Sequence, residues 1–216
     1  MENKVQPPKA KLFNLKRFFM DMARIVCSPL LLWYNLKRVY INENAKKKLH
    51  GGAIIAANHL GFSDPFILGC TFWYRRMFFL AAEVVMKPGI IGWLLKGVGC
   101  IKIDRNICDM DAIRKSTDRL KEGHLLTVFP QGGIDRNEDV TAIKSGIVLL
   151  AMQSKTPIVP VFIHKKASFF DRNTVVIGEP IAPPSVPGIA AIQEYADKIL
   201  DKMTECREHF EKTEEK

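Results

Sequence analysis

The sequence predicts an α/β domain with a mixed, largely parallel central sheet flanked by helices, preceded by an N-terminal amphipathic helical segment. Short apolar runs alternate with longer helical stretches from residue 53 to the end of the chain, and this alternation is typical of a sheet covered by helices. The chain has 216 residues, of which 47% are hydrophobic. This length and composition suffice for one domain with a sizeable core.

The elements follow one another in a regular order along the chain. We expect strands at 53–57, 77–83, 100–105, 124–130, 156–163 and 174–178, and helices at 65–74, 88–99, 109–123, 141–155 and 189–212. Asp64 is expected at the N-cap of its helix with Pro65 at the first helical position. Pro160 lies inside an apolar strand, and this position indicates either a bulge or an edge strand, because proline has no N–H to donate.

The N-terminal part of the sequence predicts a helix with one apolar face. Apolar side chains recur there at three- and four-residue steps, which is helical periodicity: Leu12, Leu15, Phe18, Phe19, Met22, Ile25 and Val26. The longest uncharged run, 25–36, is shorter than the roughly 20 apolar residues that a spanning helix needs. Residues 1–50 are therefore predicted to form a basic helical segment lying in the membrane interface. The alternative is an amphipathic helix packed on the core of the domain at 51–216.

The chain is basic. Its formal net charge is +9 and its pI is near 9.3, so we expect acidic partners: an anionic membrane surface, an acidic carrier protein or a phosphorylated small molecule. The alternative, which charge alone favours, is an ordinary solvated basic surface. Nucleic acid is not expected, because no zinc-finger spacing, basic leucine-zipper pattern or RNA-binding sheet signature occurs. The five cysteines are odd in number and form no C-x-x-C pair. This pattern predicts a reduced chain with buried thiols in a cytoplasmic setting.

A histidine and an aspartate stand close together in "AANHLGFSDPF", just after the strand at 53–57. Five residues apart on one helix they would point away from each other, but Gly61 permits a tight bend that returns Asp64 to His59. A carboxylate that accepts from one ring nitrogen fixes the tautomer and leaves the other nitrogen as a general base. A structural His–Asp pair is the alternative that this stretch alone leaves open.

Two further strand ends carry polar groups. "GCIKIDR" places Asp104 and Arg105 at the end of a strand, and arginine is well suited to hold a phosphate. "VFPQGGID" follows another strand with a proline and two glycines, and such a turn exposes backbone N–H groups to a ligand.

Together these stretches resemble the motifs of the glycerolipid acyltransferase family typified by 1-acylglycerol-3-phosphate acyltransferases, over roughly residues 50 to 180. Four motifs match in order: Asn58, His59 and Asp64; Gly99, Ile103, Asp104 and Arg105; Phe129, Pro130 and Gly132 with 143–146 behind them; and Ile158, Val159 and Pro160. The resemblance implies acyl transfer from acyl-CoA or acyl carrier protein to the hydroxyl of a lysophospholipid, in this case lysophosphatidate.

The resemblance also implies roles for particular residues. His59 is expected to take the hydroxyl proton while Asp64 holds the ring, and backbone N–H groups near Gly132 are candidates for stabilising the oxyanion. Substrate contacts are expected from Asn58, Arg105, Gln131, Gly132 and Lys144, with Arg136 as a further cation. No metal and no bound cofactor are implied. The apolar stretch 88–98 is expected either to line the groove for the acyl chain or to be a plain core helix. The expected location is the cytoplasmic face of the cell membrane, as a peripheral or monotopic protein.

The sequence departs from the family pattern in the third motif. Where the family has Phe-Pro-Glu-Gly-Thr-Arg, this chain has Phe-Pro-Gln-Gly-Gly-Ile from residue 129 onward. The change leaves the acceptor headgroup open, so another lysophospholipid, an amino-lipid or an acylated sugar are alternatives. A hydrolase that releases the acyl group to water and a non-catalytic membrane-surface protein are further alternatives.

Overall fold

The computed structural model describes residues 21–22, 36–83, 86, 89–104, 109–132, 140, 142–164, 173–186 and 188–214. The strands run in the order β1-β7-β6-β2-β5-β3-β4 in one sheet. They are β1 (Lys37–Tyr40), β2 (Ala53–Ala57), β3 (Met77–Ala82), β4 (Cys100–Ile103), β5 (Leu125–Val128), β6 (Ile158–His164) and β7 (Thr174–Ile177). All neighbours pair parallel except β6 and β7, which are antiparallel. The predicted mixed, largely parallel sheet is confirmed.

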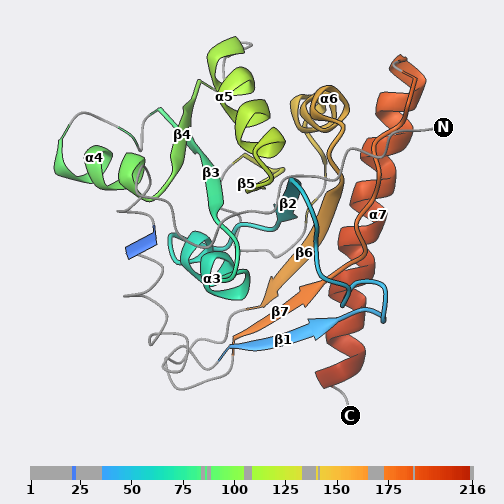
Figure 1. Ribbon diagram of the computed structural model, residues 1–216. Coiled ribbons are helices and arrows are strands. Elements are labelled where there is room, and N and C mark those ends of the chain that lie inside the picture. Colours follow the sequence, from blue (N-terminus) through green and yellow to red (C-terminus); the bar gives the residue numbers. More distant parts are fainter. Residues whose placement is uncertain are drawn as a thin grey trace.

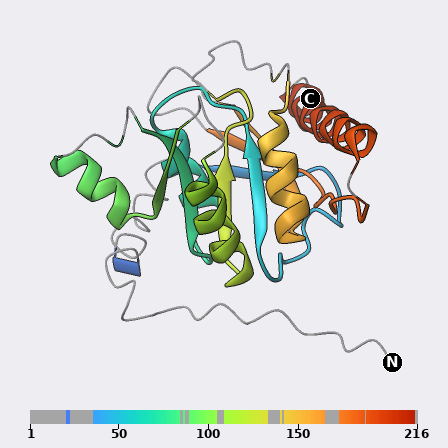
Figure 2. The ribbon, with the colours of Figure 1, turned by 90° about the horizontal axis from the view of Figure 1, so that it is seen from above.

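Helices cover both faces of the sheet (Figures 1 and 2). They are α3 (Asp64–Thr71), α4 (Ile90–Gly97), α5 (Met110–Lys121), α6 (Ser145–Ser154) and α7 (Ile189–Glu214). Alternate residues of each strand point to opposite faces. One face, with Ile54 and Leu126, packs against α5, α6 and α7. The other face, with Ile55 and Leu125, packs against α3.

One strand lies where the sequence predicts the N-terminal helical segment. Residues 37–40 form β1, which pairs with β7 from Lys37↔Thr174 to Tyr40↔Ile177. The strand is only four residues long and carries two cations, so its sequence alone shows no apolar alternation. The residues that gave the N-terminal helical pattern lie outside the described part of the chain, apart from Met22 in the helical turn 21–22. In the part that is described, every helix is too short or too polar to cross a membrane.

Pro160 lies at a bulge and not on an edge. Its strand, β6, is an interior strand between β2 and β7. Val161 pairs with Ile177, and Ile158 pairs with Ile181. Three steps along β6 (158 to 161) therefore oppose four steps on the other chain (177 to 181), and the extra residue makes a bulge. Because proline lacks an N–H, this irregular place in the ladder accommodates it without loss of a regular hydrogen bond.

The cysteines that the structure describes are thiols, and most of them are buried. Cys70 and Cys206 are buried and Cys100 is half-buried. Burial raises the pKa of Cys100 to about 11 and that of Cys206 to about 12, because an apolar surrounding disfavours the thiolate. Both thiols are therefore protonated at neutral pH and poorly nucleophilic. The other two cysteines, Cys27 and Cys108, lie outside the described residues.

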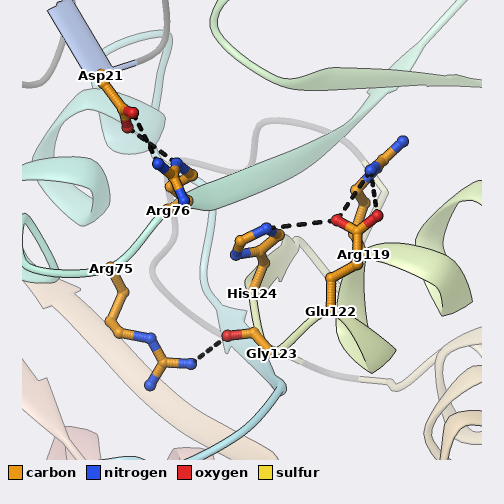
Figure 3. A network of polar contacts seen from close by, with 7 residues as sticks. All are labelled: Asp21, Arg75, Arg76, Arg119, Glu122, Gly123 and His124. Atoms are coloured by element: carbon orange, nitrogen blue, oxygen red, sulfur yellow. Dashed lines mark hydrogen bonds and ion pairs between the residues drawn. The ribbon is translucent and has the colours of Figure 1, made fainter. Parts of the chain in front are cut away.

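Two adjacent arginines hold the amino-terminal edge of the sheet (Figure 3). Arg75 donates to the backbone carbonyls of Leu49 (2.6 Å), Gly51 and Gly123 (2.6 Å), so it ties together the segments that lead into β2 and β5. Arg76 forms a two-point ion pair with Asp21, with Nε to Oδ1 at 2.9 Å and Nη2 to Oδ2 at 2.7 Å. Arg76 and Asp21 are 3% and 2% exposed, and the pair joins the N-terminal segment to the start of β3.

Replacing Arg75 by methionine should lower the free energy of unfolding by about 3 kcal/mol, because three carbonyls lose a charged donor and hydrogen bonds to charged groups contribute about 1.5–3 kcal/mol. Arg75→Lys should recover only part of this loss, since an ammonium cannot reproduce the fork of the guanidinium. Urea denaturation measures both variants. The exposed Arg114 is the matched control, and Arg114→Met should change stability by less than about 0.5 kcal/mol. If Arg75→Met and Arg114→Met lowered the free energy of unfolding equally, the hydrogen bonds of Arg75 would not stabilise the fold as expected.

Candidate active site

The turn after β2 begins with an anchored asparagine. Asn58 is 1% exposed. Its side-chain nitrogen donates to the Ile163 carbonyl at 2.9 Å, and its oxygen accepts from the Ile163 N–H at 2.7 Å. Because β6 lies next to β2, these two bonds fix the carboxyl end of β2 against its neighbour. The amide is thus engaged with the backbone and positions the turn. The substrate contact expected of Asn58 stays a prediction.

The turn closes on one carboxylate oxygen. Asp64 Oδ2 accepts hydrogen bonds from the N–H groups of Leu60 (2.7 Å) and Gly61 (2.8 Å) and from Nδ1 of His59 (2.7 Å). The Asp64 side chain is fully buried. Three donors directed at a single oxygen favour the ionised carboxylate. The predicted return of Asp64 to His59 around Gly61 is therefore present in the structure.

Asp64 does not cap the helix that it opens. The sequence analysis placed it at the N-cap, but α3 begins at Asp64 itself, and Ser63 is the N-cap without a side-chain hydrogen bond to the helix. Pro65 is accordingly the second helical position rather than the first. The physical reason is that the carboxylate points back to the turn, where it receives its donors.

The imidazole of His59 is held on two sides. Its Nδ1 faces Asp64, and since an ionised carboxylate only accepts, Nδ1 is the donor of this hydrogen bond. In the neutral form of the ring, Nε2 then carries the lone pair. The ring also stacks on Phe129, with centroids 4.0 Å apart and planes at 14°. Phe129 follows β5, which is the parallel neighbour of β2. The His59 side chain is 15% exposed, so this arrangement presents a fixed, partly accessible base.

The third motif forms a tight turn under a lysine. Gly132 has φ +72°, a conformation that favours glycine, and its N–H donates to the Phe129 carbonyl at 2.9 Å. That N–H is thus used within the turn, which removes it from the candidates for oxyanion stabilisation. A Cβ at Gly132 would lie 2.6 Å from Nζ of Lys144, so the predicted contacts Gly132 and Lys144 are brought together. Gln131 lies half-buried in the same turn.

The end of β4 is framed by an aspartate that the sequence analysis did not select. Asp109 accepts from the N–H of Ala112 at 3.0 Å, which caps α5, and from the N–H of Asp104 at 3.1 Å. These backbone hydrogen bonds, that from Ala112 first, lower the pKa of Asp109. The bonds hold the two ends of the connection that contains Arg105. Arg105 and Arg136 themselves lie outside the described residues, and their assignment to a phosphate remains a prediction.

The motif residues gather at one edge because their strands are parallel. The groups after β2, β5 and β4 all follow carboxyl ends that point the same way, and this is the edge at which open α/β sheets bind ligands. A base with a fixed tautomer, a glycine turn and a cation at that edge form a site able to deprotonate a hydroxyl beside an anionic group.

Comparison with known proteins identifies the class. The family model described as Acyltransferase matches residues 37–164, more than half of the chain. The chain belongs to this acyltransferase family, and the resemblance that the four motifs indicated is confirmed.

Individual relatives agree with the family. A 1-acyl-sn-glycerol-3-phosphate acyltransferase of Bacillus subtilis is 28% identical over 177 residues, covering 77% of this chain and 87% of the relative. The enzyme of the same name from Saccharomyces cerevisiae is 29% identical over 195 residues, covering 82% of this chain and 61% of the relative. The crystal structure of a 1-acyl-sn-glycerophosphate acyltransferase from Thermotoga maritima superposes with a TM-score of 0.63 at 19% identity, over 89% of this chain and 80% of that chain. This superposition shows the fold.

Replacing Phe129 by leucine should lower kcat about twofold to tenfold and change KM little. The substitution keeps an apolar side chain but removes the ring stack, and aromatic pairs contribute about 0.5–1.5 kcal/mol beyond the area they bury. Steady-state kinetics measure the effect. Phe62 lies in the same turn as His59 but is 85% exposed, so Phe62→Leu is the matched control and should keep the kcat of the parent protein. A Phe129→Leu enzyme with unchanged kcat would show that the stack does not hold the base.

Proposed function

We propose that this protein transfers a fatty acyl group from a thioester donor to the free hydroxyl of 1-acylglycerol-3-phosphate, forming phosphatidate. The observation that carries the proposal is the hydrogen bond between His59 and the buried Asp64 at the carboxyl edge of the sheet. Membership of the acyltransferase family and relatives named for this acceptor support it.

In the proposed reaction His59 Nε2 removes the proton of the acceptor hydroxyl while the oxygen attacks the thioester carbonyl carbon. Asp64 holds the ring and stabilises the imidazolium that forms. The tetrahedral intermediate then collapses, the C–S bond breaks, and the proton on Nε2 passes to the departing thiolate. Every proton is thereby returned, and no group other than the two substrates is consumed.

The acceptor phosphate is proposed to lie near the third motif. Lys144 reaches over Gly132, whose N–H donates to the carbonyl of Phe129, and its ammonium is proposed as a cation for the phosphate. Arg105 is proposed as the bidentate partner of the phosphate, because guanidinium geometry matches two phosphate oxygens. Gln131 supplies neutral donors and acceptors in the place of the family's glutamate.

A second acceptor class is a lyso-amino-lipid. A lyso-ornithine lipid O-acyltransferase of Rhodobacter capsulatus is 34% identical over 84 residues, which cover 38% of this chain and 29% of the relative. Gln131 is neutral and stands in the third motif where the family has a glutamate. This difference is the reason for testing such an acceptor. A panel of lysophosphatidate, other lysophospholipids and lyso-ornithine lipid, compared by kcat/KM, distinguishes the two.

Attachment to the cytoplasmic face of an anionic membrane is proposed for the whole protein. The net charge of +9 favours an anionic surface, and the amphipathic pattern of the N-terminal segment fits a helix in the interface. Lysophospholipid acceptors reside in that surface, so attachment brings the enzyme to its substrate.

Replacing His59 by alanine should lower phosphatidate formation about 100- to 10,000-fold, because general-base assistance contributes about that much. The assay combines purified protein, lysophosphatidate and an acyl thioester, with product measured by mass spectrometry. The exposed His50 provides the control, and His50→Ala should retain the parent rate. Near-parent turnover in His59→Ala, with circular dichroism showing an intact fold, would reject the base assignment.

The same assay separates the rival functions. Free fatty acid released by the parent protein in the absence of acceptor would identify a hydrolase. Vesicle binding without turnover on any acceptor would identify a non-catalytic membrane protein.

A further inference from the structure

A pocket is lined by residues of α4, of β4 and of the segment that follows β3. These elements lie at the far end of the sheet from α7 (Figure 1). Its volume is about 460 Å³, within the range of small-molecule sites. Trp93 and Met86 give it apolar walls, and Glu83, Lys96 and Lys102 give it charges. Two glycines, one just before α4 and one inside it, leave that side open. The stretch predicted to line an acyl groove or form a core helix thus lines a pocket that also carries charged groups.

The pocket combines an exposed indole with an exposed lysine, and these are groups that suit an adenine nucleotide. Trp93 is 66% exposed although it is the largest apolar side chain there, and indole faces are suited to stacking a base. Lys96 is exposed and offers its ammonium to phosphate oxygens. An acyl chain would offer no partner to the ammonium of Lys96, and burying a charge without a partner is unfavourable.

The charges are only partly compensated within the pocket. Lys102 forms an ion pair with Glu83, so one of the two lysines is neutralised by the one acidic residue of the lining. The remaining positive charge is that of Lys96. An ammonium has three donors, so Lys102 retains capacity for a phosphate oxygen beside its bond to Glu83. The pocket is therefore complementary to an anion that carries an aromatic ring.

The distance between the pocket and His59 suits a long donor that binds in the pocket at one end and reacts near His59 at the other. His59 follows β2 and the pocket lies beside β4, with β5 and β3 between them in the order β2-β5-β3-β4. Three strand spacings of about 4.8 Å amount to about 14 Å. Coenzyme A carries its adenine nucleotide and its thioester at opposite ends of an extended pantetheine arm, which is long enough to bridge such a gap.

We propose that this pocket binds the 3′-phosphorylated adenosine diphosphate end of coenzyme A, so that the acyl donor is an acyl-CoA. The inference rests on the proposed acyltransferase function and deepens it, because it decides between the two thioester donors. Acyl carrier protein presents the same pantetheine arm without a nucleotide and would leave the pocket unused.

The test compares donors that share a reactive end and differ in the nucleotide. Trp93→Ala should raise KM for palmitoyl-CoA about tenfold, since a base stack contributes about 1–3 kcal/mol. Lys96→Glu should raise it by a similar factor, since a hydrogen bond between charged groups contributes about 1.5–3 kcal/mol. Both variants should leave KM for palmitoyl-pantetheine within about twofold of the parent value. Lys198→Glu is the matched control, because it makes the same charge change at an exposed position of α7, and it should leave both KM values unchanged.

Three results would overturn the inference. KM rising equally for both donors would assign the pocket to the acyl chain or to folding. KM rising for neither donor would leave the pocket with no part in donor binding. A parent enzyme that uses palmitoyl-acyl carrier protein but not palmitoyl-CoA would exclude acyl-CoA as the donor.

The inference and the proposed function fail in different ways. Phosphatidate formed from palmitoyl-pantetheine by every variant keeps the function even where the pocket has no role. Should no donor support turnover on any acceptor, the function is rejected. Calorimetric titration of the parent and Trp93→Ala proteins with coenzyme A then decides the pocket alone, with weaker binding by the variant supporting it and equal or absent binding overturning it.

Discussion

The site depends on one buried oxygen atom, Oδ2 of Asp64. It accepts from two consecutive backbone N–H groups, those of Leu60 and Gly61, and from the ring of His59. The same contact set therefore closes the turn, sets the tautomer of the imidazole and places the ring at the end of β2. A neutral or shorter side chain at Asp64 would disturb all three together, because hydrogen bonds to an ionised acceptor are the strong ones. Loop geometry and chemistry are coupled here through a single group.

The parallel sheet brings motifs that are far apart in the sequence next to one another in space. β2 has β5 on one side and β6 on the other, so the turn after β2 is stacked by Phe129 from one neighbour and anchored by Ile163 of the other. Each contact comes from a different motif, and none requires a long side chain to reach across the sheet. The stack and the amide bonds restrict the ring and the chain that carries it, which is the preorganisation that general-base catalysis needs.

Local patterns predict the elements of this fold well and its contacts poorly. Helical and strand periodicity indicate α5, β5 and α7 within a few residues, because these segments bury one face or both. The strand order, by contrast, follows from packing between segments far apart in the chain. The ring stack of His59 on Phe129 and the amide bonds of Asn58 to Ile163 depend on that order, and no spacing within a motif encodes them.

Two features that the sequence does not predict correctly, β1 and the role of Asp64 at its helix, have physical causes of the same kind. β1 is short and bears charges, so it becomes a strand through pairing with β7 rather than through its own sequence. Asp64 has the residue type and position of an N-cap, but the carboxylate obtains more hydrogen bonds from the turn behind it than a cap would supply. The bulge at Pro160 was one of two alternatives, and only the register of the neighbouring chain distinguishes them.

The ion pair between Asp21 and Arg76 has a practical consequence for anyone who shortens this protein. Both side chains are almost fully buried and meet at two points. Deleting the leading residues to obtain a more tractable catalytic fragment would take this carboxylate away from the interior, and removing one partner of a buried pair is typically destabilising by about 3–5 kcal/mol. A fragment that begins after residue 21 would therefore be better made with an uncharged side chain, such as methionine, at position 76.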